Sequence, residues 1–302
     1  MIPGDFETYR LYANRAQTAL FCLTDSLIPN LDNEFLEMRP DETPPRPMTW
    51  PSTLDVVETH CDGFYGVTTF AADKGTGKTM LATASAIEAA ASGNWQVVYF
   101  LAEDDADGFR ERFNTYLNAH PDIADGFGRF VVQHVGRNQT PESLTAAICA
   151  SVDRSLDIPI LVAVDSINSV VNLGSGNYLS MLREFGLWAM LARRLSRGLI
   201  SFMLTTESNK RGESKGENLP FWSDIYLKMK KKSDSVVEFT LEKTRRTGGE
   251  GTSVNLRRAW HEGCFVSDSP YQRKLELVRG GAGDDDPFSP GDDVAGDIGE
   301  LF

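Results

Sequence analysis

Residues 70–81 read FAADKGTGKTML, and this segment carries the clearest chemistry in the sequence. Gly75 and Gly77 allow the backbone to turn its N–H groups inward around an anion. A helix that begins directly after them would add its positive N-terminal dipole at the same place. Lys78 could then reach the β- and γ-phosphates of a nucleotide, and the Thr79 hydroxyl could ligate a magnesium ion. The segment is therefore predicted to be a phosphate-binding loop that holds ATP and Mg²⁺.

One position departs from the complete motif G-x-x-x-x-G-K-[ST], because Ala72 stands where the first glycine is expected. A methyl group is tolerated there if the residue has a negative φ. A surface turn that matches the motif by chance is the alternative, but the motif has its required context of a strand before it and a helix after it. The expected nucleotide-binding residues are Ala72, Asp73, Lys74, Gly75, Thr76, Gly77, Lys78, Thr79 and Met80.

The composition predicts a globular chain, and no targeting segment is expected. Its 302 residues suit one large domain with extensions or two small ones, and a hydrophobic fraction of 41% is sufficient for a core. No apolar run approaches the roughly 18 residues of a membrane span, and no basic region followed by an apolar stretch opens the chain. The four cysteines are far apart, so neither structural zinc nor a disulfide framework is expected. These features predict a cytoplasmic protein with no membrane partner.

The net charge of −13 is partly concentrated near the C-terminus. Residues 281–302 contain seven Asp or Glu residues and no Lys or Arg, a composition that predicts a disordered acidic tail. The remainder of the chain is also acidic. That balance argues against a protein that coats nucleic acid, but it leaves room for a locally basic groove or pore.

Residues 1–51 are expected to form an appendage. Apolar residues recur near helical spacing over 5–27, and residues 39–51 contain five prolines, as a stiff extended linker would. The helix could pack on its own domain or dock on the next subunit of an oligomer. The sequence leaves both alternatives open.

Between these ends, strand-like and helix-like segments alternate. Apolar runs predict strands at 67–70, 96–101, 129–135, 158–164 and 199–204. Helices are expected between them at 82–91, 107–118, from 141 onward and at 178–197. Such alternation predicts an α/β fold with a mainly parallel, twisted sheet flanked by helices. Three more strand-like segments with little helix between them, expected as antiparallel additions at one edge, are 224–230, 236–243 and 252–259.

Ligands of open α/β sheets bind beyond the carboxyl ends of the strands. Three polar side chains, Glu103, Asp165 and Thr206, fall there beside the phosphate-binding loop. Asp165 follows a nearly all-apolar strand, as the magnesium-associated acid of phosphate-loop NTPases does. Glu103 is placed to orient or deprotonate a water that attacks the γ-phosphate, with Asp104 as the alternative base.

These residues resemble the RecA-type P-loop ATPase superfamily. The similar features are a strand that ends at Glu103 downstream of the motif lysine, the Val-Asp-Ser of 164–166 and the polar tip at 205–207. The loop core resembles KaiC and the DnaB/RepA-like helicases, and residues 223–263 resemble the closing strands of RadA (Sms) and KaiC. The resemblance covers roughly residues 48–266. The domains expected from it are the N-terminal helix and linker (1–51), a RecA-like ATPase domain (52–280) and the acidic tail (281–302).

The resemblance also implies cooperation between subunits. In that family a K-x-R segment supplies cations to the γ-phosphate held by the neighbouring subunit, and Lys243 and Arg245 match this segment. Cations delivered in this way stabilise the charge of the transition state. This reading implies a homo-oligomer, either a hexameric ring or a filament. The alternative is a pair of exposed basic residues on an edge strand.

The family threads DNA past the loops that follow its fourth and fifth strands. Here these loops are 172–177 and 208–216. The second loop contains Lys210, Arg211 and Lys215, which could neutralise phosphates. A plain solvated loop is the alternative.

Together these features predict an oligomeric, Mg²⁺-dependent ATPase that acts on single-stranded DNA in replication or recombination. One rival is a KaiC-like regulatory ATPase that acts on a protein partner, and another is a recombinase-like ATPase that binds DNA without unwinding it. The tail, with Phe288 and Phe302 beside acids, resembles the tails of single-strand-binding proteins and could dock on a protein partner or inhibit DNA binding. A tail that only improves solubility is the alternative.

Overall fold

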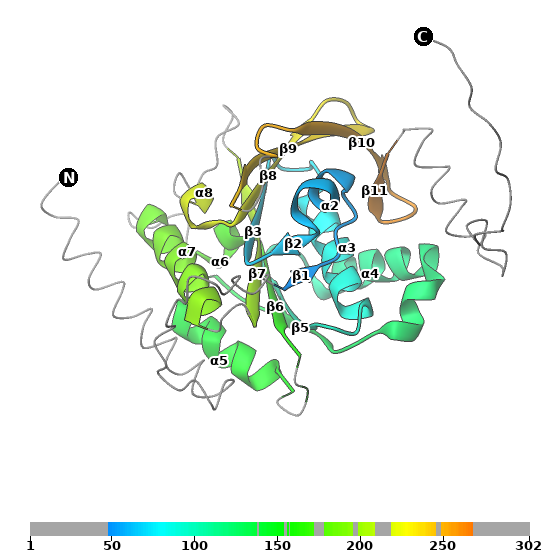
Figure 1. The fold of residues 1–302 in the computed structure, drawn as a ribbon. Helices are drawn as coiled ribbons and strands as arrows, with labels where there is room; N and C mark the ends of the chain where they lie inside the picture. Colours follow the sequence, from blue (N-terminus) through cyan, green and yellow to red (C-terminus); the bar gives the residue numbers. More distant parts are fainter. Residues whose placement is uncertain are drawn as a thin grey trace, which may run out of the picture. The chain divides into compact units, whose positions relative to one another are not determined.

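The described part of the chain is built around a nine-stranded sheet (Figure 1). The computed structural model describes residues 48–267, apart from 138, 154–155, 157, 172–177, 196–198, 209–218 and 246–248. The strands of this sheet are β3 (Val67–Ala72), β4 (Gln96–Leu101), β5 (Phe130–His134), β6 (Ile160–Asp165), β7 (Ile200–Glu207), β8 (Ile225–Lys231), β9 (Val236–Thr244), β10 (Ser253–Ala259) and β11 (Cys264–Val266). Their order across the sheet is β11-β10-β9-β8-β3-β7-β6-β4-β5.

The strands from β8 to β5 run parallel to one another, whereas β9, β10 and β11 are antiparallel to their neighbours. Every residue of β3, β4 and β6 is buried. Burial on both faces explains why these strands read as continuous apolar runs rather than as alternating patterns. The sheet therefore carries helices on both sides.

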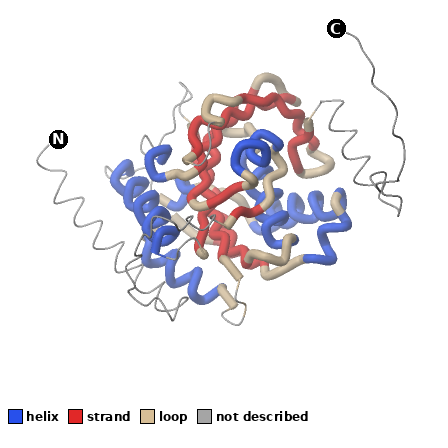
Figure 2. Tube along the Cα trace, viewed as in Figure 1, coloured by secondary structure: helices blue, strands red, loops and turns tan. Residues whose placement is uncertain are grey.

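Helices cover the two faces of the sheet (Figures 1 and 2). They are α2 (Asp55–Cys61), α3 (Lys78–Ala91), α4 (Ala106–Ala119), α5 (Pro141–Ser151), α6 (Ile167–Val170), α7 (Tyr178–Leu195) and α8 (Leu219–Trp222), with a 3₁₀ turn at Pro121–Gly126. Helices α2, α3 and α4 lie on one face, and α5 and α7 lie on the other. A separate two-stranded antiparallel sheet pairs β1 (Thr49–Trp50) with β2 (Phe64–Tyr65), with α2 between them in the chain. No helix among the described residues is long and apolar enough to cross a bilayer.

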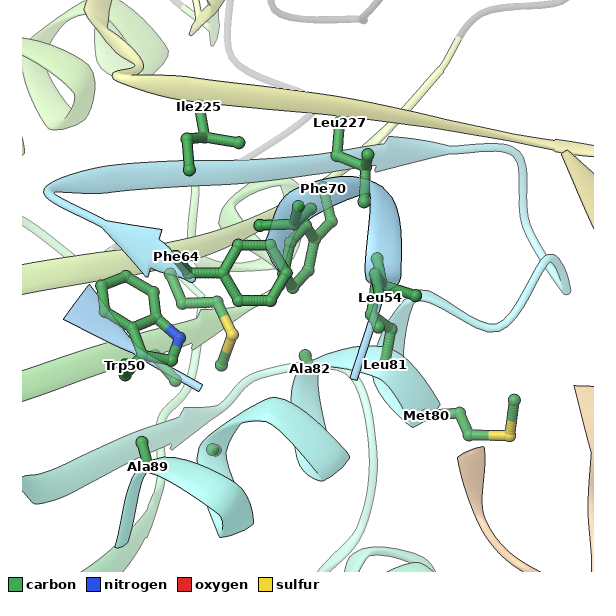
Figure 3. Close-up of a cluster of buried hydrophobic side chains, with 14 of the residues drawn as sticks. Trp50, Leu54, Phe64, Phe70, Met80, Leu81, Ala82, Ala89, Ile225 and Leu227 are labelled. Atoms are coloured by element: carbon green, nitrogen blue, oxygen red, sulfur yellow. The ribbon is translucent and has the colours of Figure 1, made fainter. Parts of the chain in front are cut away.

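Two hydrophobic clusters fill the spaces between the sheet and its helices. In the first, Trp50 and Phe64 of the β1–β2 sheet pack near Phe70 of β3 and Leu81 of α3 (Figure 3). The ring centroids of Phe64 and Phe70 are 5.2 Å apart. Full burial of one such side chain contributes about 1.5–3 kcal/mol to stability. The small β1–β2 sheet is therefore part of the core that supports the phosphate-binding loop.

The structure confirms the α/β class, the mainly parallel sheet and the antiparallel edge. It corrects one detail, because β8 runs parallel to β3 and the other central strands and is antiparallel only to β9. Thr68 of β3 pairs with Ile225 of β8 in a parallel register, and the antiparallel part begins at β9. The connection from β7 contains the short helix α8 and crosses β3, so β8 can return in the same direction as β7. The predicted N-terminal helix and the acidic tail lie outside the described residues.

Candidate active site

The polar residues predicted from the sequence gather at one edge of the sheet. Leu101 of β4 pairs with Asp165 of β6, and Ala72 of β3 pairs with Glu207 of β7, so these parallel strands end side by side. The phosphate-binding loop leaves β3 at Ala72, and Glu103 follows the end of β4. This edge is the place where open α/β sheets bind ligands.

The loop itself has the backbone that its glycines predict. Gly75 and Gly77 have φ values of +75° and +107°, in the left-handed region that side chains disfavour. Helix α3 begins at Lys78, directly after Gly77. Ala72 ends β3 and has no positive φ, so its methyl group fits where the motif usually has glycine. The N-terminal turn of α3 therefore points its free N–H groups at the loop.

Lys78 lies inside this loop and is only 7% exposed. Its Nζ donates hydrogen bonds to the carbonyl oxygens of Ala72 and Asp73, at 3.0 and 3.4 Å. Burial lowers the pKa of the Lys78 ammonium, and the nearby Glu103, Glu207 and Asp165 oppose this effect. A buried ammonium held only by carbonyl oxygens suits an anion such as a phosphate.

Asp165 is the second buried charge of the site, at 1% exposure. Its carboxylate accepts hydrogen bonds from the hydroxyls of Tyr99 at 3.0 Å and Thr205 at 2.6 Å. Burial raises the pKa of Asp165, while the hydroxyls of Thr205, Tyr99 and Thr79 partly offset the rise. The Thr79 hydroxyl thus lies next to this carboxylate. Carboxylate and hydroxyl oxygens are hard ligands, so this pair fits Mg²⁺ bound together with nucleotide phosphates.

The two carboxylates proposed as the base differ in their surroundings. Glu103 is exposed, and its Oε1 accepts hydrogen bonds from Ser166 at 2.5 Å and Ser169 at 2.8 Å. Asp104 forms an ion pair with Arg112 of α4. Because Asp104 is paired with the Arg112 guanidinium, Glu103 is favoured over Asp104 as the candidate base.

Thr206 is fully buried at the end of β7. Its hydroxyl donates to Oδ1 of Asn168 at 2.9 Å, and the backbone N–H of Glu207 donates to the same oxygen at 2.7 Å. Asn168 thus fixes the polar end of β7 against α6.

The structure separates Lys243 and Arg245 from all these residues. In β9, Thr244 pairs with Ile225 at the start of β8, which is the amino edge of the parallel strands. The Lys243 ammonium donates to the carbonyl oxygens of Pro220 and Phe221, and Arg245 Nη2 donates to Phe221 at 2.8 Å. Burial, followed by the charge of Arg245, lowers the pKa of Lys243.

The distance along the sheet excludes a direct contact between these cations and the phosphate-binding loop of the same chain. The register places Thr68 opposite Ile225, while the loop begins after Ala72. The intervening strand residues rise about 3.3 Å each, so more than 10 Å of β3 lies between. Arg245 also pairs with Asp224, with 3.7 Å between Nε and Oδ1.

Sequence reasoning missed two residues that contact the loop from the β10–β11 hairpin. Arg258 is 6% exposed, and its Nη1 donates to the Gly75 carbonyl oxygen at 3.1 Å. Phe265 lies so close to Gly77 that an added Cβ would stand 2.7 Å from its ring. The alternation of residues in β10 turns Arg258 inward, but the facing loop is distant in sequence and gives no local signal.

The predicted DNA loops fall almost wholly outside the described residues, including Lys210, Arg211 and Lys215. Of 208–216, only Ser208 is described, and its N–H donates to the Ala72 carbonyl oxygen at 3.0 Å. Within the described part of the chain, no group of three His, Cys, Asp or Glu side chains is arranged to hold a metal ion. The Thr79 and Asp165 pair is a smaller set, as expected where phosphates and waters complete the coordination of Mg²⁺.

Comparisons with known proteins agree with this geometry. The model of a family of AAA domains (AAA_25) matches residues 52–211. The ATPase domain of G40P has a similar fold, with a TM-score of 0.59 and 14% identity over 74% of this chain and 92% of that chain. A structure of a DnaB-like replicative helicase and its interactions with primase gives a TM-score of 0.59 and 13% identity, covering 74% of this chain and 62% of that chain.

Identities this low show a shared fold and nothing finer. No curated protein matches the sequence. The family match covers more than half of the chain, and the fold agrees with the predicted RecA-type class. The chain belongs to the AAA_25 family of AAA domains and has the RecA-type P-loop ATPase fold found in DnaB-like helicases.

Proposed function

We propose that this chain is a Mg²⁺-dependent ATPase that works as a homo-oligomer on single-stranded DNA. One observation carries the ATPase proposal. A buried ammonium (Lys78), a buried carboxylate (Asp165) and an exposed carboxylate (Glu103) converge at the loop edge of the sheet. These are an anion-binding group, a metal-binding group and a base within one site.

Each residue has a role in the proposed hydrolysis. Lys78 and the N–H groups of the loop bind the β- and γ-phosphates. Thr79 and Asp165 would hold Mg²⁺, which supplies positive charge to the phosphate oxygens when bound. Glu103 orients a water and accepts its proton while the water oxygen bonds to the γ-phosphorus and the bond to the ADP oxygen breaks. Thr206, predicted as a catalytic residue, is buried and donates its hydroxyl proton to Asn168, so its proposed role is to shape the polar end of β7 beside the γ-phosphate.

The positions of Lys243 and Arg245 support the proposed oligomer. They lie at the edge of the sheet opposite the loop, so they can reach a phosphate only on another subunit. A head-to-tail arrangement of copies gives a ring if the rotation closes and a filament if it does not. We propose that residues 52–280 form the unit that assembles, with 1–51 as an N-terminal extension and 281–302 as the acidic tail.

The DNA role is proposed from the fold that this chain shares with a DnaB-like replicative helicase and from Lys210, Arg211 and Lys215 in the segment after β7. A regulatory ATPase that acts on a protein partner is the rival reading. The two readings predict different ATPase rates, because only a DNA motor should hydrolyse ATP faster when DNA occupies its binding loops.

The test is ATP hydrolysis with and without an oligo(dT) strand, in the presence and absence of Mg²⁺. Lys78→Ala should abolish both nucleotide binding and turnover, whereas Glu103→Gln should keep binding and stop turnover. Arg129→Ala, at the amino edge of the sheet before β5, and Glu142→Gln, in the first turn of α5, are controls away from the loop and should behave as the wild type. Wild-type turnover in Glu103→Gln would reject the base assignment, and a rate indifferent to oligo(dT) would reject the DNA role.

A further inference from the structure

Helix α6 touches two parts of the candidate site that the sequence does not connect. It is a single turn after β6, and side chains at its start reach both Glu103 beyond β4 and the polar end of β7. We propose that Ser169 and Asn168 are positioning residues that hold the base Glu103 and the polar end of β7 in one fixed arrangement. This inference rests on the proposed ATPase function and deepens it.

The first part of the arrangement is the pair of hydrogen bonds that Glu103 accepts. Ser166 and Ser169 both donate to the same oxygen, Oε1, at 2.5 and 2.8 Å. Two donors on one carboxylate oxygen fix the rotation of the carboxylate. The other oxygen, Oε2, is then left in a defined direction. A base must lie within hydrogen-bond reach of the proton that it takes, so its orientation matters directly for the rate.

The second part is the pair of hydrogen bonds between Asn168 and the end of β7. Oδ1 of Asn168 accepts from the Thr206 hydroxyl at 2.9 Å and from the Glu207 N–H at 2.7 Å. Asn168 is 1% exposed, and Thr206 is fully buried. Both bonds converge on one amide oxygen, so a shift of α6 would move the polar end of β7 together with Glu103.

A purely structural role explains these contacts less well. The buried side chains Ile167 and Val170 anchor α6 in the hydrophobic cluster on this face, and backbone hydrogen bonds from Val170 and Val171 close its turn. Ser169 is only half-buried, so water could satisfy its hydroxyl equally well. Its bond to an exposed carboxylate is therefore not needed to bury either group.

The decisive variant is Ser169→Ala, which removes one donor to Glu103 at a half-exposed position. Turnover should fall about tenfold, since general-base catalysis contributes about 10²–10⁴-fold in rate and one of two positioning donors remains. Nucleotide affinity and Tm should stay at wild-type values. Ser169→Thr keeps the hydroxyl and should restore most of the rate. Ser92→Ala, at the far end of α3, removes an equally half-buried hydroxyl and should leave turnover unchanged.

Two further measurements separate positioning from general destabilisation. In the Glu103→Gln background, Ser169→Ala should cause no further loss of the residual rate, because the orientation of a base no longer matters. Asn168→Ala should lower turnover with nucleotide affinity retained. If this buried variant proves unstable by thermal unfolding, the comparison of Ser169→Ala with Ser169→Thr still decides the matter.

The outcomes distinguish this inference from the function on which it rests. Full activity in Glu103→Gln would overturn the proposed base itself. A slow Glu103→Gln together with a full-rate Ser169→Ala would overturn the positioning role and leave the ATPase proposal standing. Equal losses in Ser169→Ala and Ser169→Thr would also count against it, because the hydroxyl would then not be the feature that matters.

Discussion

Asp165 is a carboxylate buried at the centre of the candidate site, and its burial has a measurable consequence for stability. Burial raises its pKa in the folded protein above the unfolded value of about 3.9. The folded state then holds this proton more tightly, so stability is lost as the pH rises from the unfolded value through the folded pKa. The cost is absent below about pH 3.9 and complete above the folded pKa.

Asp165→Asn should therefore raise the Tm of the nucleotide-free protein at neutral pH. The gain should shrink as the pH falls towards 4, roughly the unfolded pKa of Asp. Thermal unfolding over a pH series measures both effects. Asp234→Asn is a suitable control, since Asp234 is exposed and a bond from Lys231 lowers its pKa, so its loss should give no such gain. A gain for Asp165→Asn that does not change with pH would contradict this account.

The sequence predicts the residues of the loop better than the residues that support it. Gly75, Gly77 and Lys78 belong to one local motif, whose chemistry follows from a few consecutive positions. Tyr99 and Thr205, which bond to Asp165, come from two different strands. Tyr99 reads as one more apolar residue of a buried strand until the pairing of β4 with β6 brings it to the carboxylate.

At the scale of elements, the β10–β11 hairpin braces the phosphate-binding loop from outside. Arg258 bonds to the carbonyl of Gly75, and the Phe265 ring lies against Gly77. Loop carbonyls point away from a bound phosphate when the N–H groups point towards it. A cation on the outer side therefore fixes the loop in the conformation that binds an anion.

Arg258→Ala should weaken ATP binding by about 10- to 100-fold, because a charge-assisted hydrogen bond of about 1.5–3 kcal/mol to the loop is lost. Arg258→Lys should recover part of the affinity, since it keeps the charge. Arg257→Ala is the matched control, because the neighbouring residue points to the other face of β10. Titration with a fluorescent nucleotide measures the affinity, and thermal unfolding follows stability. A lower Tm with unchanged ATP affinity would mean that Arg258 contributes to stability and not to nucleotide binding.

Element length decided which parts of the fold the sequence could reveal. The strands and helices around the loop are long enough for their periodicity to show, and α5 begins at Pro141, as predicted, with Thr140 as its N-cap. Helices α6 and α8 have four residues each, too few for a helical period. Because α8 was not predicted from the sequence, the crossover that makes β8 parallel to β3 was not predicted either. Because α6 was not predicted either, the sequence did not reveal the contacts through α6 that connect Glu103 with Thr206.

At the scale of the whole described domain, the direction of the parallel strands separates two sets of candidate catalytic groups. The loop and its acids lie at the carboxyl edge, and Lys243 and Arg245 lie at the amino edge. A structural alternative accounts for the same cations. They donate to the carbonyl oxygens at the C-terminal end of α8, a common way to satisfy the last carbonyls of a helix. Only an experiment on mixed subunits separates the two roles.

Arg245→Ala subunits should bind ATP but hydrolyse it slowly, and Lys78→Ala subunits should not bind it. If the cation acts on the neighbouring subunit, a co-assembled 1:1 mixture should recover up to about a quarter of the wild-type rate, because one interface in four pairs an intact loop with an intact Arg245. A mixture of Lys78→Ala with the Lys78→Ala/Arg245→Ala double variant has no such interface and should stay inactive. The rate is measured in mixtures whose co-assembly is verified by pull-down of one tagged variant. No recovery in verified mixtures, together with a lowered Tm for Arg245→Ala alone, would mean that Arg245 serves only to hold α8 against β9.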